Sequence, residues 1–327
     1  MELSVDRIMF LFKKMSFKDA QHPFYPYTEE EKQEIRKELG LKESTIQDDI
    51  DAILDWFKKQ PHLIEAGITR EIVERMLIIS KGSLEKTKQR IDNFYKYRGF
   101  APELIQNREK ELCSHNRGIW TFIRQAAMPK LYNGNRVSVF KFIEPDPGKC
   151  NTDILFRNTF MLGDIRLSYD YMLGDIWVLD IKAVGFGHVL RANPVTMQKT
   201  AHIFQDGMGL RIAAIHVLNA PVLGQTILTF MKQFFKPKIM DRVLIHESVE
   251  ELHKHLPKQY LPKDYGGDLP SMEDFKDKYE KELRNDKTKK YLLDFSKLIS
   301  DERKRPGASI YDEYTRMSGS FKKLDLD

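Results

Sequence analysis

The chain has 327 residues, of which 41% are hydrophobic and 11% aromatic, a composition that excludes disorder over the whole length. The 53 lysines and arginines exceed the 48 aspartates and glutamates by five, and so small an excess over this length does not indicate a nucleic-acid-binding protein. Two cysteines, Cys113 and Cys150, exclude a disulfide scaffold and a four-thiolate zinc site and are typical of free thiols in a reducing compartment.

We predict that residues 1–44 form an exposed lead-in and that residues 45–100 form a small helical domain. The first helix of that domain carries apolar residues at positions i, i+3, i+4 and i+7, namely Ile50, Ile53, Leu54 and Phe57. A second helix follows Pro61, and Ser83 can cap the N-terminus of a third. We therefore expect three short helices between residues 45 and 98.

Strand-like and helix-like segments alternate over residues 101–270, which we expect to form the second domain. The predicted strands are Arg136–Ile143, Ile176–Leu179, Arg211–Leu218 and Val243–Ile245. The predicted helices are Asp153–Leu167, Pro194–Gln205, Pro221–Phe235 and Ser248–His255. This alternation predicts an α/β fold of βαβ units with a mostly parallel sheet. Residues 271–327 then form a charged C-terminal extension, in which Tyr291–Ile299 predict one docked helix.

One uncharged stretch is long enough to span a bilayer. Residues Ile212 to Met231 contain no Asp, Glu, Lys or Arg over 20 positions. Pro221 divides this stretch into a β-branched part and a helix-like part. We interpret it as a buried strand that leads into an apolar helix.

Motifs for covalent chemistry are missing from the sequence. It has no Gly-x-Ser-x-Gly elbow, no Walker lysine motif and no complete dinucleotide fingerprint after Gly185 or Gly207. His253 and His255 lie two residues apart, so on a helix they point to different faces and do not predict a metal site. The sequence therefore predicts no enzyme, no catalytic residue, no metal and no cofactor.

The helix predicted after Pro221 is the most apolar of the chain, and positive charges adjoin it. A helix this apolar is either part of the core or a lid over a hydrophobic molecule that also touches a membrane. Between Gly207 and His246 only Asp241 opposes five cations: Arg211, Lys232, Lys236, Lys238 and Arg242. Because each cation near an anionic membrane contributes about 1 kcal/mol, this cluster favours the lid interpretation.

Several segments of this region resemble a known family. Gln205–Arg211 and Ile215–Pro221 are similar to the signature of the CRAL-TRIO (Sec14-like) lipid-binding family, Phe234–Ile239 to its next motif, and Leu261–Gly267 to the motif that closes its domain. Pro61–Leu63 and Ser83–Thr87 resemble its helical N-terminal domain. Within the family, the sequence is most similar to the branch of the α-tocopherol transfer and retinaldehyde-binding proteins.

The resemblance covers about residues 45–270 and implies a CRAL-TRIO domain: a mostly parallel sheet flanked by helices, an apolar lid helix, and a small all-α domain in front. It implies a carrier that holds one tocopherol, retinoid, carotenoid or similar terpenoid in an internal pocket and exchanges it at membranes. The implied pocket walls are Phe140, Phe142, Phe156, Thr159, Phe160, Val178, Phe186, Ile203, Phe204, Leu210 and Ile215, with Ile227, Phe230, Met231 and Phe234 on the inner side of the lid.

The implied contacts with phosphoinositide head groups are Arg211, Lys238 and Arg242, joined by Lys232 and Lys236 at the end of the lid. Ala213 stands where this branch has a second cation on the strand, which predicts weaker head-group binding. We expect a cytoplasmic monomer that contacts anionic membranes transiently. Two alternatives stay open: a lipid-sensing adaptor that recruits a protein through its charged extension, and a phospholipid exchanger.

Overall fold

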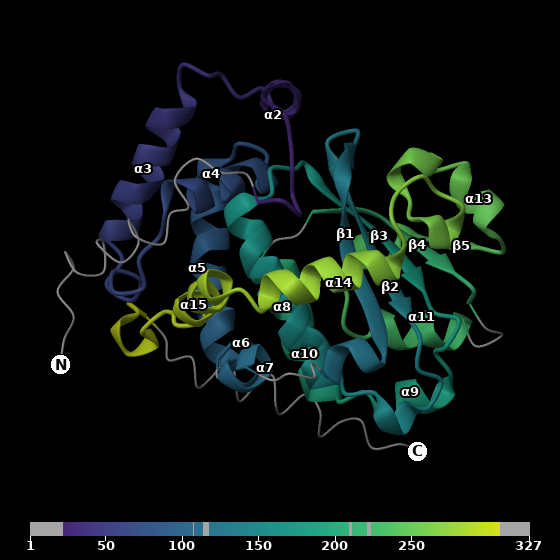
Figure 1. The fold of residues 1–327 in the computed structure, drawn as a ribbon. Helices are drawn as coiled ribbons and strands as arrows, with labels where there is room; N and C mark the ends of the chain where they lie inside the picture. The colour runs from purple at the N-terminus through teal and green to yellow at the C-terminus, as the bar shows by residue number, and fades with distance from the viewer. Residues whose placement is uncertain (1–21, 107, 114–117, 209–210, 221–223, 308–327) are drawn as a thin grey trace.

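The computed structural model describes residues 22–106, 108–113, 118–208, 211–220 and 224–307. A helical lobe lies beside a lobe built on a five-stranded sheet (Figure 1). The helical lobe contains α3 (Ile46–Lys58), α4 (Arg70–Ile79) and α5 (Leu84–Phe100), which confirms the three expected helices, and α2 (Glu29–Glu38) precedes them. The Ser83 hydroxyl accepts a hydrogen bond from the Lys86 backbone N–H, so it caps α5 as the sequence predicts.

The sheet has the order β1-β2-β3-β4-β5. Its strands are β1 (Ile123–Tyr132), β2 (Asn135–Phe142), β3 (Gly174–Asp180), β4 (Ile212–Leu218) and β5 (Val243–His246). β1 and β2 are antiparallel, and the three other neighbouring pairs are parallel. The predicted α/β fold with a mostly parallel sheet is therefore confirmed.

Helices connect the parallel strands. Between β2 and β3 runs α8 (Thr152–Tyr169), and between β3 and β4 run α9 (Phe186–Arg191), α10 (Pro194–His202) and a π-helical turn, η3 (Ile203–Gly207). Between β4 and β5 lie α11 (Gly224–Lys232) and α12 (Pro237–Met240). After β5 follow α13 (Val249–His253), α14 (Met272–Leu283) and α15 (Asp286–Phe295); the short α6 (Pro102–Ile105) and α7 (Glu109–Cys113) join the lobes.

Strand β1 was not predicted from the sequence, and Pro129 within it explains why. Proline cannot donate a hydrogen bond to a sheet and is therefore found on edge strands and at bulges. Here β1 is an edge strand, and its pairing with β2 is interrupted between Ala127 and Leu131, the stretch that contains Pro129. The irregular strand consequently lacks the alternation of apolar and polar residues by which strands are found in sequences.

The two faces of the sheet have different covers. One face, which we call the lid face, carries the side chains of Phe140, Trp177 and Leu179. On this face Trp177 contacts Phe204 of η3, with 5.9 Å between the ring centroids. Val178 and His216 point to the opposite face, which we call the back face. The back face packs against residues that follow β5, among them Leu252 and Tyr265, whose hydroxyl donates to Asp180 at 3.0 Å.

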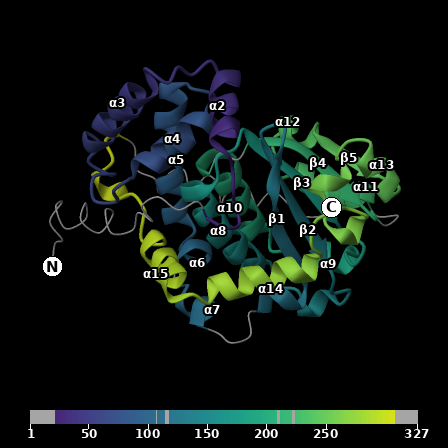
Figure 2. The same ribbon diagram turned by 45° about the horizontal axis from the view of Figure 1, so that its top comes forward.

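The C-terminal extension is packed against both lobes. α14 runs along β1, where the Tyr279 hydroxyl accepts a hydrogen bond from the Ala127 N–H at 3.0 Å, and α15 reaches the helical lobe (Figure 2). The expected docked helix is thus confirmed. Arg98 of α5 donates to the carbonyl oxygens of Phe295 and Leu298 at 2.8 and 3.1 Å. The extension therefore joins the two lobes.

A buried carboxylate lies at this joint. Asp164 of α8 accepts hydrogen bonds from Arg98 at 2.6 Å and from Arg108 at 2.7 Å, and all three side chains are at most 1% exposed. Because two guanidinium groups share one carboxylate, loss of its charge leaves both cations buried without compensation.

We expect Asp164→Asn to lower the free energy of unfolding by about 3–5 kcal/mol, the cost of breaking a buried ion pair from one side. Chemical denaturation measures this change. Asp55→Asn is the matched control, since Asp55 pairs with Lys58 on the surface of α3, where loss of the pair costs less than about 1 kcal/mol. Equal effects of the two substitutions would contradict the role given to Asp164.

Three histidines meet on the back face. His216 Nδ1 lies 2.8 Å from His246 Nε2, and the His255 ring is 5.5 and 5.2 Å from the two rings, centroid to centroid. Burial, followed by the neighbouring His246 and His255, lowers the pKa of His216 to about 4 from its ordinary 6.5. Burial and the nearby His255 also lower the pKa of His246, whereas Glu251 acts in the opposite direction.

These shifts predict acid sensitivity. Between pH 6.5 and about 4 the unfolded chain binds more protons at position 216 than the folded chain does, so the free energy of unfolding is highest above pH 6.5 and falls as the pH drops toward 4. Denaturation curves collected at several pH values across this range measure how steeply the free energy of unfolding depends on pH. His216→Gln is expected to flatten this dependence, and an unchanged slope in that variant would contradict the assignment.

Candidate functional site

Two cavities lie on the lid face, and Trp177 of β3 lines both of them. The first, which we call the inner chamber, has a volume of about 60 Å³ and lies between β1–β3, α4, α8 and the lead-in. The second, the outer chamber, has a volume of about 70 Å³ and lies between β3–β5 and α11. Trp177 and its contacts with Phe140 and Phe204 separate the two chambers.

The outer chamber is lined by apolar side chains. Its floor consists of residues that alternate along three parallel strands, Leu179, Ile181, Ile215, Val217, Val243 and Ile245. Its roof consists of Ile227, Leu228 and Met231 of α11, with Phe235 behind them. α11 thus lies over an apolar cavity.

Polar interactions fix both ends of this roof. Where β4 ends, Asn219 adopts a left-handed conformation with φ of 53°, and its amide donates to Asp180 at 2.8 Å. Asparagine tolerates this conformation better than most residues. At the other end the Lys236 backbone N–H donates to the Gln205 side chain at 2.7 Å, and the Lys236 ammonium pairs with Asp206. The chain between Asn219 and Lys236, which we call the lid segment, is therefore attached to the sheet at its start and to η3 at its end.

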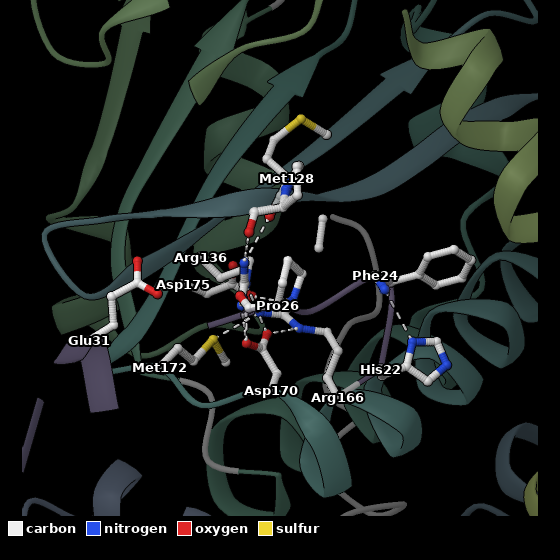
Figure 3. A network of polar contacts seen from close by, with 12 residues as sticks. His22, Phe24, Pro26, Glu31, Met128, Arg136, Arg166, Asp170, Met172 and Asp175 are labelled. Atoms are coloured by element: carbon white, nitrogen blue, oxygen red, sulfur yellow. Dashed lines mark hydrogen bonds and ion pairs between the residues drawn. The ribbon is translucent and has the colours of Figure 1, made fainter. Parts of the chain in front are cut away.

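The inner chamber has a polar floor (Figure 3). Arg166 of α8 donates to Asp170 at 3.0 Å and to Asp175 at 2.6 Å, and Ser138 donates to Asp175 at 2.8 Å. Arg136 of β2, which does not itself line the chamber, donates to Asp170 at 2.8 Å. Burial opposes the charge on Asp170, but Arg136 and Arg166 outweigh it and hold the pKa of Asp170 below its ordinary value. Two cations and two anions thus compensate each other in this floor.

Other polar groups of the inner chamber are neutral. The Thr159 hydroxyl lies 3.1 Å from the Gln125 side-chain oxygen and 2.9 Å from the Leu155 carbonyl. Tyr25 and Tyr279 add two phenol groups, and Tyr25 comes from the lead-in before α2. The chamber combines these groups with apolar walls from Phe140, Leu162 and Phe204.

The residues predicted as pocket walls fall into three groups. Phe140, Thr159 and Phe204 line the inner chamber, and Ile215, Ile227 and Met231 line the outer chamber. A second group lies near the chambers without lining them: Phe142, Phe156, Phe160, Ile203, Phe230 and Phe234. The third consists of Val178, Phe186 and Leu210; Leu210 lies outside the described residues.

Two of these placements correct the prediction. Val178 points to the back face, because side chains alternate along a strand and its neighbours Trp177 and Leu179 point to the lid face. Phe186 lies on the surface of α9 and is 47% exposed, because the chain has left the sheet after Asp180 before it reaches this residue. Neither residue lines a chamber.

Trp177 is the main residue that the sequence reasoning missed. The alternation of β3 puts Trp177 on the same face as Leu179 and opposite Val178, but only the pairing of Phe140 with Leu179 in the structure shows that this face is the one Phe140 shares. Tyr25 could not have been found, because nothing in the sequence places the lead-in against the sheet.

The five predicted basic residues do not form one cluster. Lys232, Lys236 and Lys238 are exposed at the end of the lid segment. Arg242 instead donates to the Ile212 carbonyl, and Arg211 is half-buried with one guanidinium nitrogen, Nη1, that has no hydrogen-bond partner among the described residues. Lys236 is also engaged, with Asp206, whose pKa is lowered: burial opposes its charge, but His202 and Lys236 outweigh it.

In the described part of the chain, no set of three or more His, Cys, Asp or Glu side chains is placed to hold a metal ion. The described helices include none that is long and apolar enough to cross a membrane. The uncharged stretch from Ile212 to Met231 contains β4 and most of α11, as interpreted from the sequence, with residues 221–223 outside the described part.

Comparison with known proteins agrees with this architecture. Residues 132–267 match the family described as CRAL/TRIO domain, and residues 42–113 match the family described as Pinta-like, UBA domain. Residues 132–267 thus carry the CRAL/TRIO match. The resemblance seen in the sequence is thereby confirmed, while the domain boundaries expected at residues 44, 100 and 270 stay predictions.

The chain is similar to the mouse "Alpha-tocopherol transfer protein-like" (Mus musculus), with 24% identity over 258 residues, which are 73% of this chain and 70% of the relative. "Clavesin-1" of Xenopus laevis is 20% identical over 246 residues, 72% of each chain. The crystal structure of Sfh5 aligns with a TM-score of 0.43 and 14% identity over 91% of this chain and 99% of that chain.

The position of Trp177 generates a prediction. Trp177→Ala is expected to join the two chambers, because among the described residues it alone lines both. It should also lower the free energy of unfolding, by less than the roughly 3–5 kcal/mol typical of fully buried aromatic residues replaced by alanine, because Trp177 is only partly buried. Among apolar probes of increasing chain length, the variant should prefer longer ones than the wild type does.

The affinities of the probes are compared by letting them compete with one another for the protein. Trp177→Phe is the matched control, because it keeps an aromatic ring between the two chambers. The same chain-length preference in wild type and Trp177→Ala would show that Trp177 does not separate the chambers.

Proposed function

We propose that this protein is a carrier that binds one small hydrophobic molecule, a tocopherol, retinoid, carotenoid or similar terpenoid, and exchanges it at membranes when α11 opens. The observation that carries this proposal is the outer chamber, an apolar cavity whose roof is one short helix held by polar contacts at both ends. The role requires no covalent chemistry, so the protein acts as a carrier and not as an enzyme.

The energetics of such a ligand explain why a carrier is useful. A terpenoid of roughly 20–30 carbons gains about 0.8 kcal/mol for each buried CH₂ group, so its transfer out of water is worth on the order of 15–25 kcal/mol. Spontaneous desorption from a bilayer is correspondingly slow. A cavity lined by hydrocarbon needs only to match the bilayer interior, and direct contact between lid and membrane then lowers the barrier.

Surface residues near the chambers support the membrane contact. On α9, Phe186 is 47% and Leu190 69% exposed, four residues apart and hence on one side of the helix. Exposed large apolar side chains at this spacing are suited to insertion into the membrane interface. Lys232 and Lys238 offer positive charge at the end of the lid segment. We accordingly propose a cytoplasmic monomer that contacts anionic membranes transiently, phosphoinositide-containing ones among them.

The alternatives have less support. The adaptor alternative uses the charged extension as a recruiting tail, yet up to Arg305 the extension is docked, with Arg305 paired to Asp92 of α5 at 2.8 Å. The phospholipid-exchanger alternative is tested by identifying the bound ligand. Organic extraction of the purified protein, followed by mass spectrometry, is expected to yield one neutral terpenoid per chain. A stoichiometric phospholipid would overturn the terpenoid class and favour the exchanger.

The charge pattern generates a further prediction. Replacing Lys232 and Lys238 together by alanine is expected to lower binding to anionic vesicles about 10- to 30-fold, at about 1 kcal/mol for each cation, and to leave ligand affinity unchanged. Transfer from vesicles with and without phosphatidylserine measures the effect, which should shrink as salt is added.

The matched control removes the same charge from the helical lobe, at the exposed Lys58 and Lys59 of α3. If this control slowed transfer as much as the lid variant, net charge and not its position would be responsible. If ligand affinity fell together with transfer, the two lysines would belong to the fold of the lid.

A further inference from the structure

Two of the three histidines on the back face lie directly behind the floor of the outer chamber. His216 of β4 and His246 of β5 are 3% and 5% exposed, and their imidazoles are joined by a hydrogen bond of 2.8 Å. Side chains alternate along a strand, so the sequence neighbours of these histidines point to the opposite face. There Ile215, Val217 and Ile245 line the outer chamber. A displacement of the two histidines therefore also displaces the chamber floor.

The contact between the two imidazoles is compatible with only one proton between its nitrogens. In the neutral pair one ring donates and the other accepts. When both rings are protonated, two N–H groups face each other, and two positive charges lie on rings whose centroids are 5.1 Å apart. The exposed His255 adds a third imidazole, 5.5 Å from the His216 ring and 5.2 Å from the His246 ring. Full protonation is therefore incompatible with this contact.

The segment behind the cluster offers little negative charge to compensate these protons. Glu251 of α13 raises the pKa of His246, but burial and His255 outweigh it. Its carboxylate also accepts a hydrogen bond from the Glu247 N–H at 2.9 Å. The remaining imidazole of α13, on His253, has its Nε2 2.8 Å from the Tyr265 carbonyl oxygen and is thus directed away from the cluster.

The strands beside the cluster do not compensate the protons either. The residue of β3 paired with His216 is the apolar Val178. Asp180, two positions further along β3, already accepts hydrogen bonds from two other side chains. Arg242, which precedes β5, donates to a backbone carbonyl of β4. Protonation of the histidines therefore adds charge that the described surroundings do not neutralise.

The part of this region that can yield is β5. It lies at the edge of the sheet and pairs with β4 through four residues, and Leu244 and Ile245 are each 40% exposed. α13 is anchored more firmly, since Leu252 and the following Leu256 are completely buried in the core. Repulsion between the imidazoles consequently displaces β5. This movement takes Val243 and Ile245 out of the chamber floor and loosens the end of the lid segment, which continues into β5 through α12.

We propose that His216, His246 and His255 form a pH-sensitive switch, in which protonation displaces β5 and releases the carried molecule as the pH falls. The proposal rests on the proposed carrier function and adds its regulation. Protons accumulate at anionic membrane surfaces, because the negative potential of the surface attracts them. The switch therefore acts in the same direction as contact between the carrier and such a membrane.

The size of the effect follows from the difference in proton affinity between the two states. With β5 displaced, the imidazoles are in water and have their ordinary pKa of 6.5; with β5 in place, burial, followed by His246 and His255, lowers the pKa of His216 to about 4. A falling pH therefore favours the displaced state over the range between these values. For this one group, the population of the displaced state and the rate of release rise about 20-fold between about pH 7 and pH 5.

The test uses the full chain loaded with retinol. Its release into an excess of methyl-β-cyclodextrin, in the absence of membranes, is followed by the loss of energy transfer from tryptophan. Release from the wild type should be about 20-fold faster at pH 5 than at pH 7. Hydrogen exchange, corrected for its intrinsic dependence on pH, should become faster at the lower pH in β5 and stay unchanged in β1, β2 and β3.

His216→Gln should reduce the acceleration to within about threefold, since the amide can still bond to His246 but does not titrate. His255→Gln is a second variant, at an exposed position where the fold is not at risk. It should give a smaller acceleration than the wild type, because His255 lowers the pKa of both buried histidines. His253→Gln is the matched control: it removes an imidazole that contacts Tyr265 instead of the cluster, and should behave as the wild type.

Three results would overturn the proposal: a release rate that is the same at both pH values, an acceleration that both His216→Gln and His255→Gln retain in full, or hydrogen exchange that becomes faster over the whole chain, which would indicate global unfolding. Failure of the carrier function itself looks different. The wild type then binds no retinol at pH 7, whereas hydrogen exchange in β5 still tests the switch.

Discussion

The ion pairs of Asp170 with Arg136 and Arg166 are the interaction on which the rest of the structure depends. They bring together β2, the end of α8 and, through the Pro26 carbonyl, the lead-in. All three side chains are largely removed from water, so each charge is stable only because the others are present. This mutual dependence gives the inner chamber a floor that is polar in its groups yet neutral in its charge.

The site follows from two consequences of parallel strands. Their alternating side chains give one face of β3, β4 and β5 a continuous apolar surface, and their carboxyl ends lie at the same edge, where Asp180 holds both Asn219 and Tyr265. The lid segment starts at that edge and returns to η3 through Gln205 and Lys236. An apolar helix is thereby kept over an apolar floor by polar contacts that are few and lie at its ends.

Much of the fold could be read from the sequence, and the failures have physical reasons. The βαβ alternation and the three N-terminal helices were predictable because each produces a local pattern. β1 was not, since Pro129 and the bulge remove the alternation. Of the predicted walls, Phe140 and Ile215 line chambers, whereas Val178 was assigned to the wrong face and Phe186 lies on the surface. Tyr25 depends on a long-range contact, which no local pattern encodes.

The docking of the C-terminal extension bears on how the chain folds during synthesis. Arg98 bonds to Leu298, 200 residues further along, and Asp92 pairs with Arg305, 213 residues away. During synthesis, the N-terminal helices and the last strand, which ends at His246, emerge from the ribosome before Leu298 and Arg305 do. Arg98 then has only part of its hydrogen bonds, and the joint between the lobes forms last. The contacts that join the lobes can therefore form only after the C-terminal extension has been synthesised.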